Sequence, residues 1–92
     1  MIRLDDVVRK SPAYLFRWEP SQDAHVLLYP EGIVKLNATA AEILSRCTGQ
    51  RVADIVAQLA EEFAVEAVDA IRADVLQFLE DARERGWIRT DA

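Results

Sequence analysis

The stretch VLLYPEGIVKLNATAAEILSRCTG, residues 26–49, predicts two strands, a tight turn and a capped helix in one unit. The apolar runs 26–29 and 33–36 favour strands, and Pro30-Glu31-Gly32 between them is typical of a three-residue hairpin loop. In this loop proline presets φ at the first corner, and we expect the glycine to take the left-handed backbone. Asn37 is a good N-cap, and the apolar residues after it recur at helical spacing: Ala40, Ile43, Leu44 and Cys47.

The patterns on either side of this unit complete an α+β fold. Tyr14, Phe16 and Trp18 alternate with other residues, which predicts a first strand with aromatic side chains on one face. Two further apolar stripes at helical spacing predict a second and a third helix. The stripes are Val52, Ile55, Val56, Leu59 and Phe63, and then Val68, Ile71, Val75, Phe78, Leu79 and Ala82. Gly86 is expected to end the third helix at its C′ position. We therefore expect a three-stranded antiparallel meander in residues 14–36 and a three-helix bundle in residues 38–86, an arrangement resembling a winged helix-turn-helix.

Length and composition set the class of protein. A chain of 92 residues that is 51% hydrophobic and 29% charged is typical of one globular domain, here residues 1–92. The N-terminal arm, residues 1–13, shows no firm pattern, which leaves open whether it is ordered or partly mobile. The apolar runs are too short to span a bilayer, the first residues lack the apolar stretch of a signal peptide, and the single cysteine excludes an internal disulfide. We expect a cytoplasmic protein with no membrane partner.

Several short motifs, taken in order, resemble those of one family. The motif PEG-x-x-x-LN occupies residues 30–37, and the other pieces are Phe16-Arg17-Trp18-Glu19, Cys47-Thr48-Gly49, Asp74-Val75, Phe78-Leu79 and Gly86-Trp87-Ile88. Together they resemble the PqqD family, the small proteins of pyrroloquinoline quinone biosynthesis. Two departures concern local stability: residues 49–52 contain no Ser or Thr to cap the second helix, and His25 stands where a larger aromatic residue is more typical.

The resemblance implies a peptide chaperone that catalyses no reaction. Such a protein holds a precursor peptide and presents it to a radical S-adenosylmethionine enzyme. The physical route is β-augmentation, in which an extended peptide pairs with an exposed sheet edge. The last strand of a meander has one unpaired side, so residues 33–36 are the natural edge.

A groove needs a second wall, and the third helix supplies a candidate. On a helical wheel Leu76 lies about 100° from the centre of the apolar stripe, between Arg72 and Arg83. This favours a peptide with apolar and acidic side chains. The alternative is that Leu76 only widens the core stripe, while Arg72 and Arg83 pair with Asp69 and Glu80. The candidate peptide-binding residues are Ile33, Val34, Lys35, Leu36, Arg72, Val75, Leu76 and Leu79.

The residues that catalysis or metal binding needs are scarce in this chain. With one histidine, His25, and one cysteine, Cys47, a zinc site or a Cys-His couple has little to complete it. His25 is expected to be a partly buried structural imidazole, and Cys47 a small buried thiol on the apolar face of the first helix. Three isolated glycines form no phosphate loop. We predict that the protein is not an enzyme and binds no cofactor or metal.

The distribution of charge weighs against a nucleic-acid partner. Residues 1–48 carry six basic and six acidic side chains, whereas residues 49–92 carry five basic and ten acidic ones, which accounts for the net charge of −5. The alternative function is DNA binding or a transcription-associated role through the helix-turn-helix. Residues 49–63, however, contain Arg51 against three acidic residues, which is the wrong charge for DNA. The short edge strands also leave open a homodimer formed by strand exchange.

Overall fold

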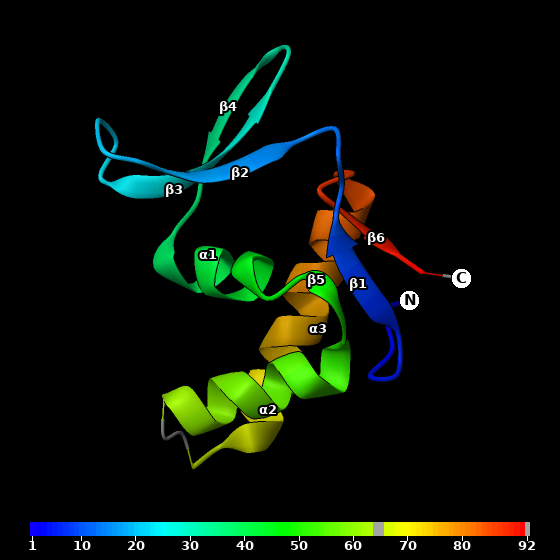
Figure 1. Ribbon diagram of the computed structural model, residues 1–92. Helices are drawn as coiled ribbons and strands as arrows, with labels where there is room; N and C mark the ends of the chain where they lie inside the picture. Colours follow the sequence, from blue (N-terminus) through cyan, green and yellow to red (C-terminus); the bar gives the residue numbers. More distant parts are fainter. Residues whose placement is uncertain (64–65, 92) are drawn as a thin grey trace.

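The computed structural model describes residues 1–63 and 66–91, which form two small sheets and three helices (Figure 1). This arrangement confirms the predicted α+β fold. The predicted helical region 38–86 includes residues 64 and 65, which lie outside the described residues. The elements are β1 Val7–Lys10, β2 Leu15–Glu19, β3 Ala24–Tyr29, β4 Gly32–Lys35, α1 Ala38–Ser45, β5 Thr48–Arg51, α2 Val52–Glu62, α3 Val68–Glu84 and β6 Ile88–Thr90.

Strands β2, β3 and β4 form the predicted antiparallel meander, with β3 in the centre and the other two at the edges. The turn between β3 and β4 differs from the predicted loop. Tyr29 pairs with Gly32, so Pro30 and Glu31 alone form the turn, and Gly32 lacks the left-handed φ that we expected. Because Pro30 and Glu31 both have negative φ, the turn is not of type II and needs no glycine. The left-handed residue of this sheet is Asp23, with φ 51°, in the turn before β3.

One face of this sheet, the inner face, lies against the helices. Phe16, Leu27 and Val34 form a cross-strand row on it, in which Leu27 is buried and the other two pack against the core. The predicted aromatic face of the first strand is also here. The rings of Phe16 and Trp18 both contact the imidazole of His25, with centroids 5.1 and 5.2 Å away. The sheet therefore adds apolar surface to the helical core. In Figure 1 it lies above α1.

The second sheet was not predicted, and it gives the N-terminal arm a regular structure. Strand β1 lies between β5 and β6 and is antiparallel to both. Within it Val8 is opposite Gln50 on one side and Thr90 on the other. The side chain of Val8 is fully buried in the core. These strands have only three or four residues each, which is too short for a periodic pattern to be recognised in the sequence.

The arm also supplies the cap that the second helix lacks. The N-cap residue Arg51 makes no side-chain capping bond. Instead, the backbone N–H of Val52 donates to the Asp6 carbonyl at 2.9 Å, and that of Ala53 donates to the Leu4 carbonyl at 2.8 Å. The first N–H groups of a helix have no partner within it, so these two bonds satisfy donors that a Ser or Thr would otherwise serve. The missing cap residue is thus compensated by tertiary structure.

The first helix begins as predicted, and the third helix ends as predicted. The Asn37 side chain accepts from the Ala40 N–H at 2.8 Å and caps α1. After α3, Gly86 takes a left-handed φ of 80°, and the Trp87 N–H donates to the Ala82 carbonyl at 2.9 Å. This is a Schellman motif, and it turns the chain into β6.

Three core assignments need correction. The first is Val68 at the start of α3, which its spacing places in the core stripe and which is 39% exposed. Cys47 is buried as expected, but it follows the last turn of α1 rather than lying on it, because the helix ends at Ser45. Phe63 is not part of the core stripe of α2. It is the C-cap residue of that helix and is 51% exposed. The rest of the predicted stripe of α2 is buried: Val52, Ile55, Val56 and Leu59.

We predict that the arm contributes directly to stability. Ile2 is 4% exposed and belongs to the core, and its N–H donates to the Glu80 carboxylate at 2.7 Å. Ile2→Ala should lower the free energy of unfolding by about 2–4 kcal/mol, measured by urea denaturation, because it leaves a cavity in the core. Leu4→Ala is the matched control, since Leu4 is 37% exposed and should cost about 1 kcal/mol or less. Equal effects of the two changes would contradict the packing of the arm.

The same contact predicts a dependence of stability on pH. The Ile2 N–H, and Arg83 after it, hold the pKa of the Glu80 carboxyl below its ordinary value. A lowered pKa means that the folded state binds this proton less tightly than the unfolded state. The contribution is therefore present above the ordinary glutamate pKa and is lost as the pH falls through the folded value. Glu80→Gln should remove this part of the acid sensitivity.

Candidate functional site

The free side of β4 is the first part of the candidate site. The Leu36 N–H donates to the His25 carbonyl on β3 at 2.9 Å. Hydrogen-bonded pairs alternate in an antiparallel ladder, so the backbone groups of Val34 also point toward β3, where Val34 is opposite Leu27. The N–H and C=O groups of Ile33 and Lys35 point the other way, toward the open edge. The structure thus confirms the predicted edge position of this strand.

A groove begins at the start of α1, two residues beyond the end of β4. It lies between the three helices, with a volume of about 300 Å³. Its floor is apolar, and three polar side chains stand among the lining residues. The lining residues are Ala38, Thr39, Glu42 and Ile43 from α1, Leu59 from α2, Phe63 after it, and Ile71, Asp74 and Val75 from α3.

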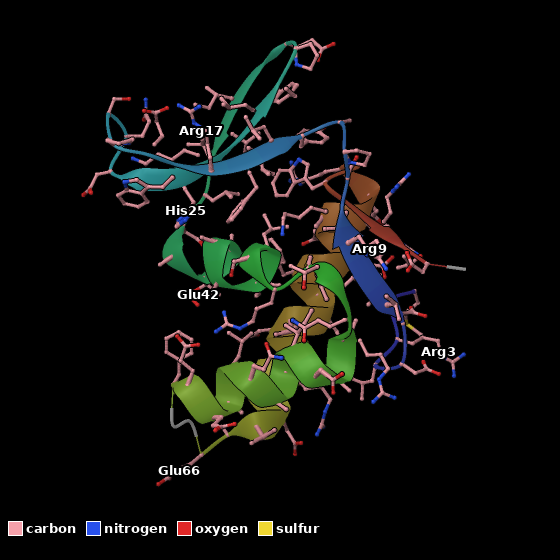
Figure 2. The ribbon with its side chains drawn as sticks, viewed as in Figure 1. Arg3, Arg9, Arg17, His25, Glu42 and Glu66 are labelled. Atoms are coloured by element: carbon pink, nitrogen blue, oxygen red, sulfur yellow. The ribbon has the colours of Figure 1, made fainter. Side chains whose placement is uncertain are left out.

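Carboxylates dominate the rim of this groove. Arg46 lies between two of them: it donates to Glu42 at 2.7 Å and also pairs with Glu62 of α2. Figure 2 shows Glu42 directed from α1 toward α2. Asp74, on the α3 side, takes part in no ion pair among residues 1–63 and 66–91. The lining itself holds two carboxylates, Glu42 and Asp74, and the Arg46 guanidinium beside it is shared between Glu42 and Glu62, so the groove has a net negative charge.

The structure brings some of the candidate residues together and separates others. Ile33 and Lys35 are exposed on the edge strand, whereas Leu36 is buried in the core beneath it. On α3, Val75 is 2% exposed at the floor of the groove, and Leu79 is fully buried. Leu79 therefore has no surface to offer a ligand in this structure.

Arg72 and Leu76 do not line the groove. Successive residues of a helix are about 100° apart, so Asp74 and Leu76 lie on opposite sides of Val75. The groove opens on the Asp74 side. Leu76 packs against the core, Arg72 pairs with Asp69 at 2.7 Å, and Arg83 pairs with Glu80. These contacts agree with the alternative in which Leu76 widens the core stripe and the two arginines have intrahelical partners.

The single cysteine and the single histidine both pack against other side chains. Burial raises the pKa of the Cys47 thiol to about 11, so it stays protonated at neutral pH. The imidazole of His25 is stacked on the Phe16 ring with an interplanar angle of 8°. Within residues 1–63 and 66–91 no group of three metal-ligating side chains gathers, and no helix in that part of the chain is long and apolar enough to cross a membrane.

Comparison with known proteins identifies the family. The model of the family described as coenzyme PQQ synthesis protein D (PqqD) matches residues 24–88, well over half of the chain. The chain belongs to the PqqD family. Three relatives are each named PqqA binding protein: that of Azotobacter vinelandii is 54% identical over 86 residues, 92% of this chain and 91% of the relative. That of Pseudomonas aeruginosa is 51% identical over 92% of this chain and 91% of the relative. That of Methylococcus capsulatus is 40% identical over 92% of this chain and 89% of the relative.

A solved PqqD structure shares the fold. It is the solution NMR structure of the PqqD truncation of Methylobacterium extorquens PqqCD, described as a functional and stand-alone recognition element for ribosomally synthesized and post-translationally modified peptides. The TM-score is 0.79 at 24% identity, and the match covers 97% of this chain and 95% of the other. The predicted resemblance to PqqD is thus confirmed at the level of sequence and of fold.

We predict that Cys47 serves only packing. Cys47→Ala should lower the free energy of unfolding by roughly 1 kcal/mol and leave ligand binding unchanged, because the thiol fills space in the core. In the native protein iodoacetamide should alkylate Cys47 slowly at pH 8, and fast only after urea unfolds the chain. Rapid alkylation of the native protein would contradict the burial and the raised pKa. Since the neutral thiol is favoured in the folded state, this residue should also reduce stability as the pH rises from about 9 toward 11.

Proposed function

We propose that this protein is a cytoplasmic peptide chaperone of pyrroloquinoline quinone biosynthesis that catalyses no reaction itself. It binds a precursor peptide as a fourth strand on β4 and presents it to a radical S-adenosylmethionine enzyme. The observation that carries this proposal is the open edge of β4, which is followed after only two residues by α1, whose first residues line an apolar groove. Family membership supports it, since the relatives are named for binding PqqA.

The edge and the groove fit one extended ligand. A strand paired with Ile33 and Lys35 extends the sheet, and alternate side chains of that strand face the inner side, where α1 lies. The sheet edge ends at Lys35 and α1 begins at Ala38. A peptide that continues past Lys35 therefore reaches the groove within two or three residues, at about 3.3 Å per residue. We assign the backbone contacts to β4 and the side-chain pocket to the groove.

The second edge of the sheet is a weaker candidate. Strand β2 also has an unpaired side, but an ion pair between Arg17 and Glu19 stands on it at 3.1 Å. Charged side chains are a common means of protecting an edge strand from pairing. No residue of β2, or of the turn after it, lines the apolar groove between the helices, which favours β4.

The groove favours an apolar side chain with a positive charge beside it. The floor offers Ile43, Leu59 and Val75, and the rim carries more carboxylates than cations. A Lys or Arg of the peptide next to the inserted residue would complement Asp74. This differs from the acidic peptide that the arginines of α3 favoured in the sequence, because those arginines lie on the other flank and are already paired.

Magnitudes set the expected affinity. Ile33 and Lys35 together offer about four backbone hydrogen bonds, each worth roughly 0.5–1.5 kcal/mol net. An apolar side chain buried in the groove adds about 1.5–3 kcal/mol. Association and the ordering of a flexible peptide cost several kcal/mol against this gain. We expect a Kd in about the micromolar to high-nanomolar range.

We predict that removing one outward N–H from β4 strongly weakens peptide binding. Lys35→Pro should reduce affinity at least about tenfold in isothermal titration with the precursor peptide, because proline has no donor and its ring blocks the approach of a paired strand. The protein should stay folded by circular dichroism, since this N–H does not serve the ladder to β3. Lys35→Ala is the matched control: it keeps the N–H and should bind nearly as well as the native protein. Undiminished binding by a folded Lys35→Pro protein would exclude augmentation at β4.

A second prediction separates the two flanks of α3. Phe63→Ala should weaken peptide binding by about 1–2 kcal/mol with little change in melting temperature, because an exposed groove residue contacts ligand more than core. Leu76→Ala should do the reverse, lowering the melting temperature and leaving affinity unchanged. If Leu76→Ala lost affinity and Phe63→Ala did not, the site would lie on the flank of Arg72 and Leu76.

A further inference from the structure

The outer face of the β2-β3-β4 sheet, opposite the inner face, carries an apolar row that the fold does not cover. The register places Leu15, Leu28 and Ile33 side by side, one from each strand. Leu15 is 55% exposed and Ile33 is 48% exposed, while Leu28 between them is partly buried. Cross-strand neighbours of this kind form a continuous surface, and contiguous exposed apolar residues commonly mark a site of protein contact.

A hollow of about 340 Å³ continues the row beyond its Leu15–Leu28 end. It is formed where the chain passes from β1 into β2 and meets the turn after β3. Two prolines and two tyrosines contribute to its walls, which are Pro12, Ala13, Tyr14, Leu15, Leu28, Tyr29 and Pro30. The rings of Tyr14 and Tyr29 contact each other, with centroids 5.3 Å apart. Tyr29 alternates with the inner-face Leu27, and Tyr14 packs against the core, so the hollow meets the outer face through Leu15 and Leu28.

Positive charge borders the other side of the row. Arg17 and Lys35 flank Val26 in the next cross-strand row, and Val26 itself is fully buried between them. Arg17 pairs with Glu19, but Lys35 takes part in no ion pair within the part of the chain that the structure describes. A chain with a net charge of −5 thus has a basic border at this face, which is complementary to a surface bearing carboxylates.

The peptide cannot cover this surface by itself. A strand bound to β4 lies beyond that edge, so two strand spacings, about 10 Å, separate β4 from β2 and its Leu15. The peptide would, however, project every second side chain onto the outer face, beside Ile33 and Lys35. The bound peptide would then extend the outer face instead of hiding it.

We propose that this outer face is the docking surface for a folded protein partner whose contact patch has apolar side chains bordered by Asp and Glu. The bound peptide widens the surface, so the partner contacts the chaperone and the peptide together. The contact between the partner and the bound peptide rests on the proposed function. The docking of the partner on Leu15 and Arg17 does not rest on it. The partner most directly implied is the enzyme that receives the peptide.

The test uses substitutions on β2, two strands away from the peptide edge. Proteins that carry Leu15→Asp or Arg17→Glu are titrated into the pathway's radical S-adenosylmethionine enzyme, with and without precursor peptide. A protein that carries Leu4→Asp is the control, because it also replaces an exposed leucine by an acidic residue. We expect both β2 variants to lose affinity for the enzyme at least tenfold, and Leu4→Asp to lose less than twofold. Peptide affinity, measured separately, should stay within twofold for all three proteins.

The outcomes separate this inference from the proposed function. Unchanged affinity of both β2 variants for the enzyme, or failure of the native protein to bind it, would overturn the docking surface even if the peptide binds. Failure of the native protein to bind peptide would instead overturn the proposed function. If the native protein is a dimer in sedimentation and Leu15→Asp makes it monomeric without affecting the enzyme, the face is an interface between copies of this chain, and the proposal is wrong.

Discussion

The pairing of β1 with both β5 and β6 is the constraint on which the rest of the structure depends. It joins three parts of the chain that are about 40 residues apart, and it places the arm so that Leu4 and Asp6 can cap α2. Loop closure over such separations costs entropy, which the burial of Val8 and Ile2 helps to offset. With the helices fixed in this way, the meander packs its inner face on the core and keeps one edge of β4 unpaired.

The local features of the fold could be predicted from the sequence, and the long-range ones could not. The Asn37 cap, the Gly86 ending and the meander all depend on neighbours within a few residues, where propensity and turn chemistry act. The second sheet depends on pairing between short strands that have no pattern of their own. Even the turn at Gly32 differed, because Tyr29 and Gly32 pair directly and leave a turn that requires no glycine.

The same division applies to the candidate site. The edge position of β4 follows from the order of strands in a meander, so Ile33 and Lys35 could be anticipated. Helical periodicity located the core stripe of α3 but not the flank that opens to solvent. That choice depends on where α1 and the end of α2 lie, and they form the groove on the Asp74 side. Phe63 was missed for a related reason: its spacing fits the core stripe, but the helix ends there and turns the ring outward.

The account rests on the claim that peptide pairs with the outward backbone groups of β4. Residue-resolved amide hydrogen exchange, with and without precursor peptide, tests it most directly. In the free protein the Val34 N–H should already be protected by β3, whereas those of Ile33 and Lys35 should exchange fast. Peptide should slow exchange at Ile33 and Lys35 and leave Val34 unchanged. Protection that appears instead at Phe16 and Trp18 of β2, or only on the helices, would contradict the account.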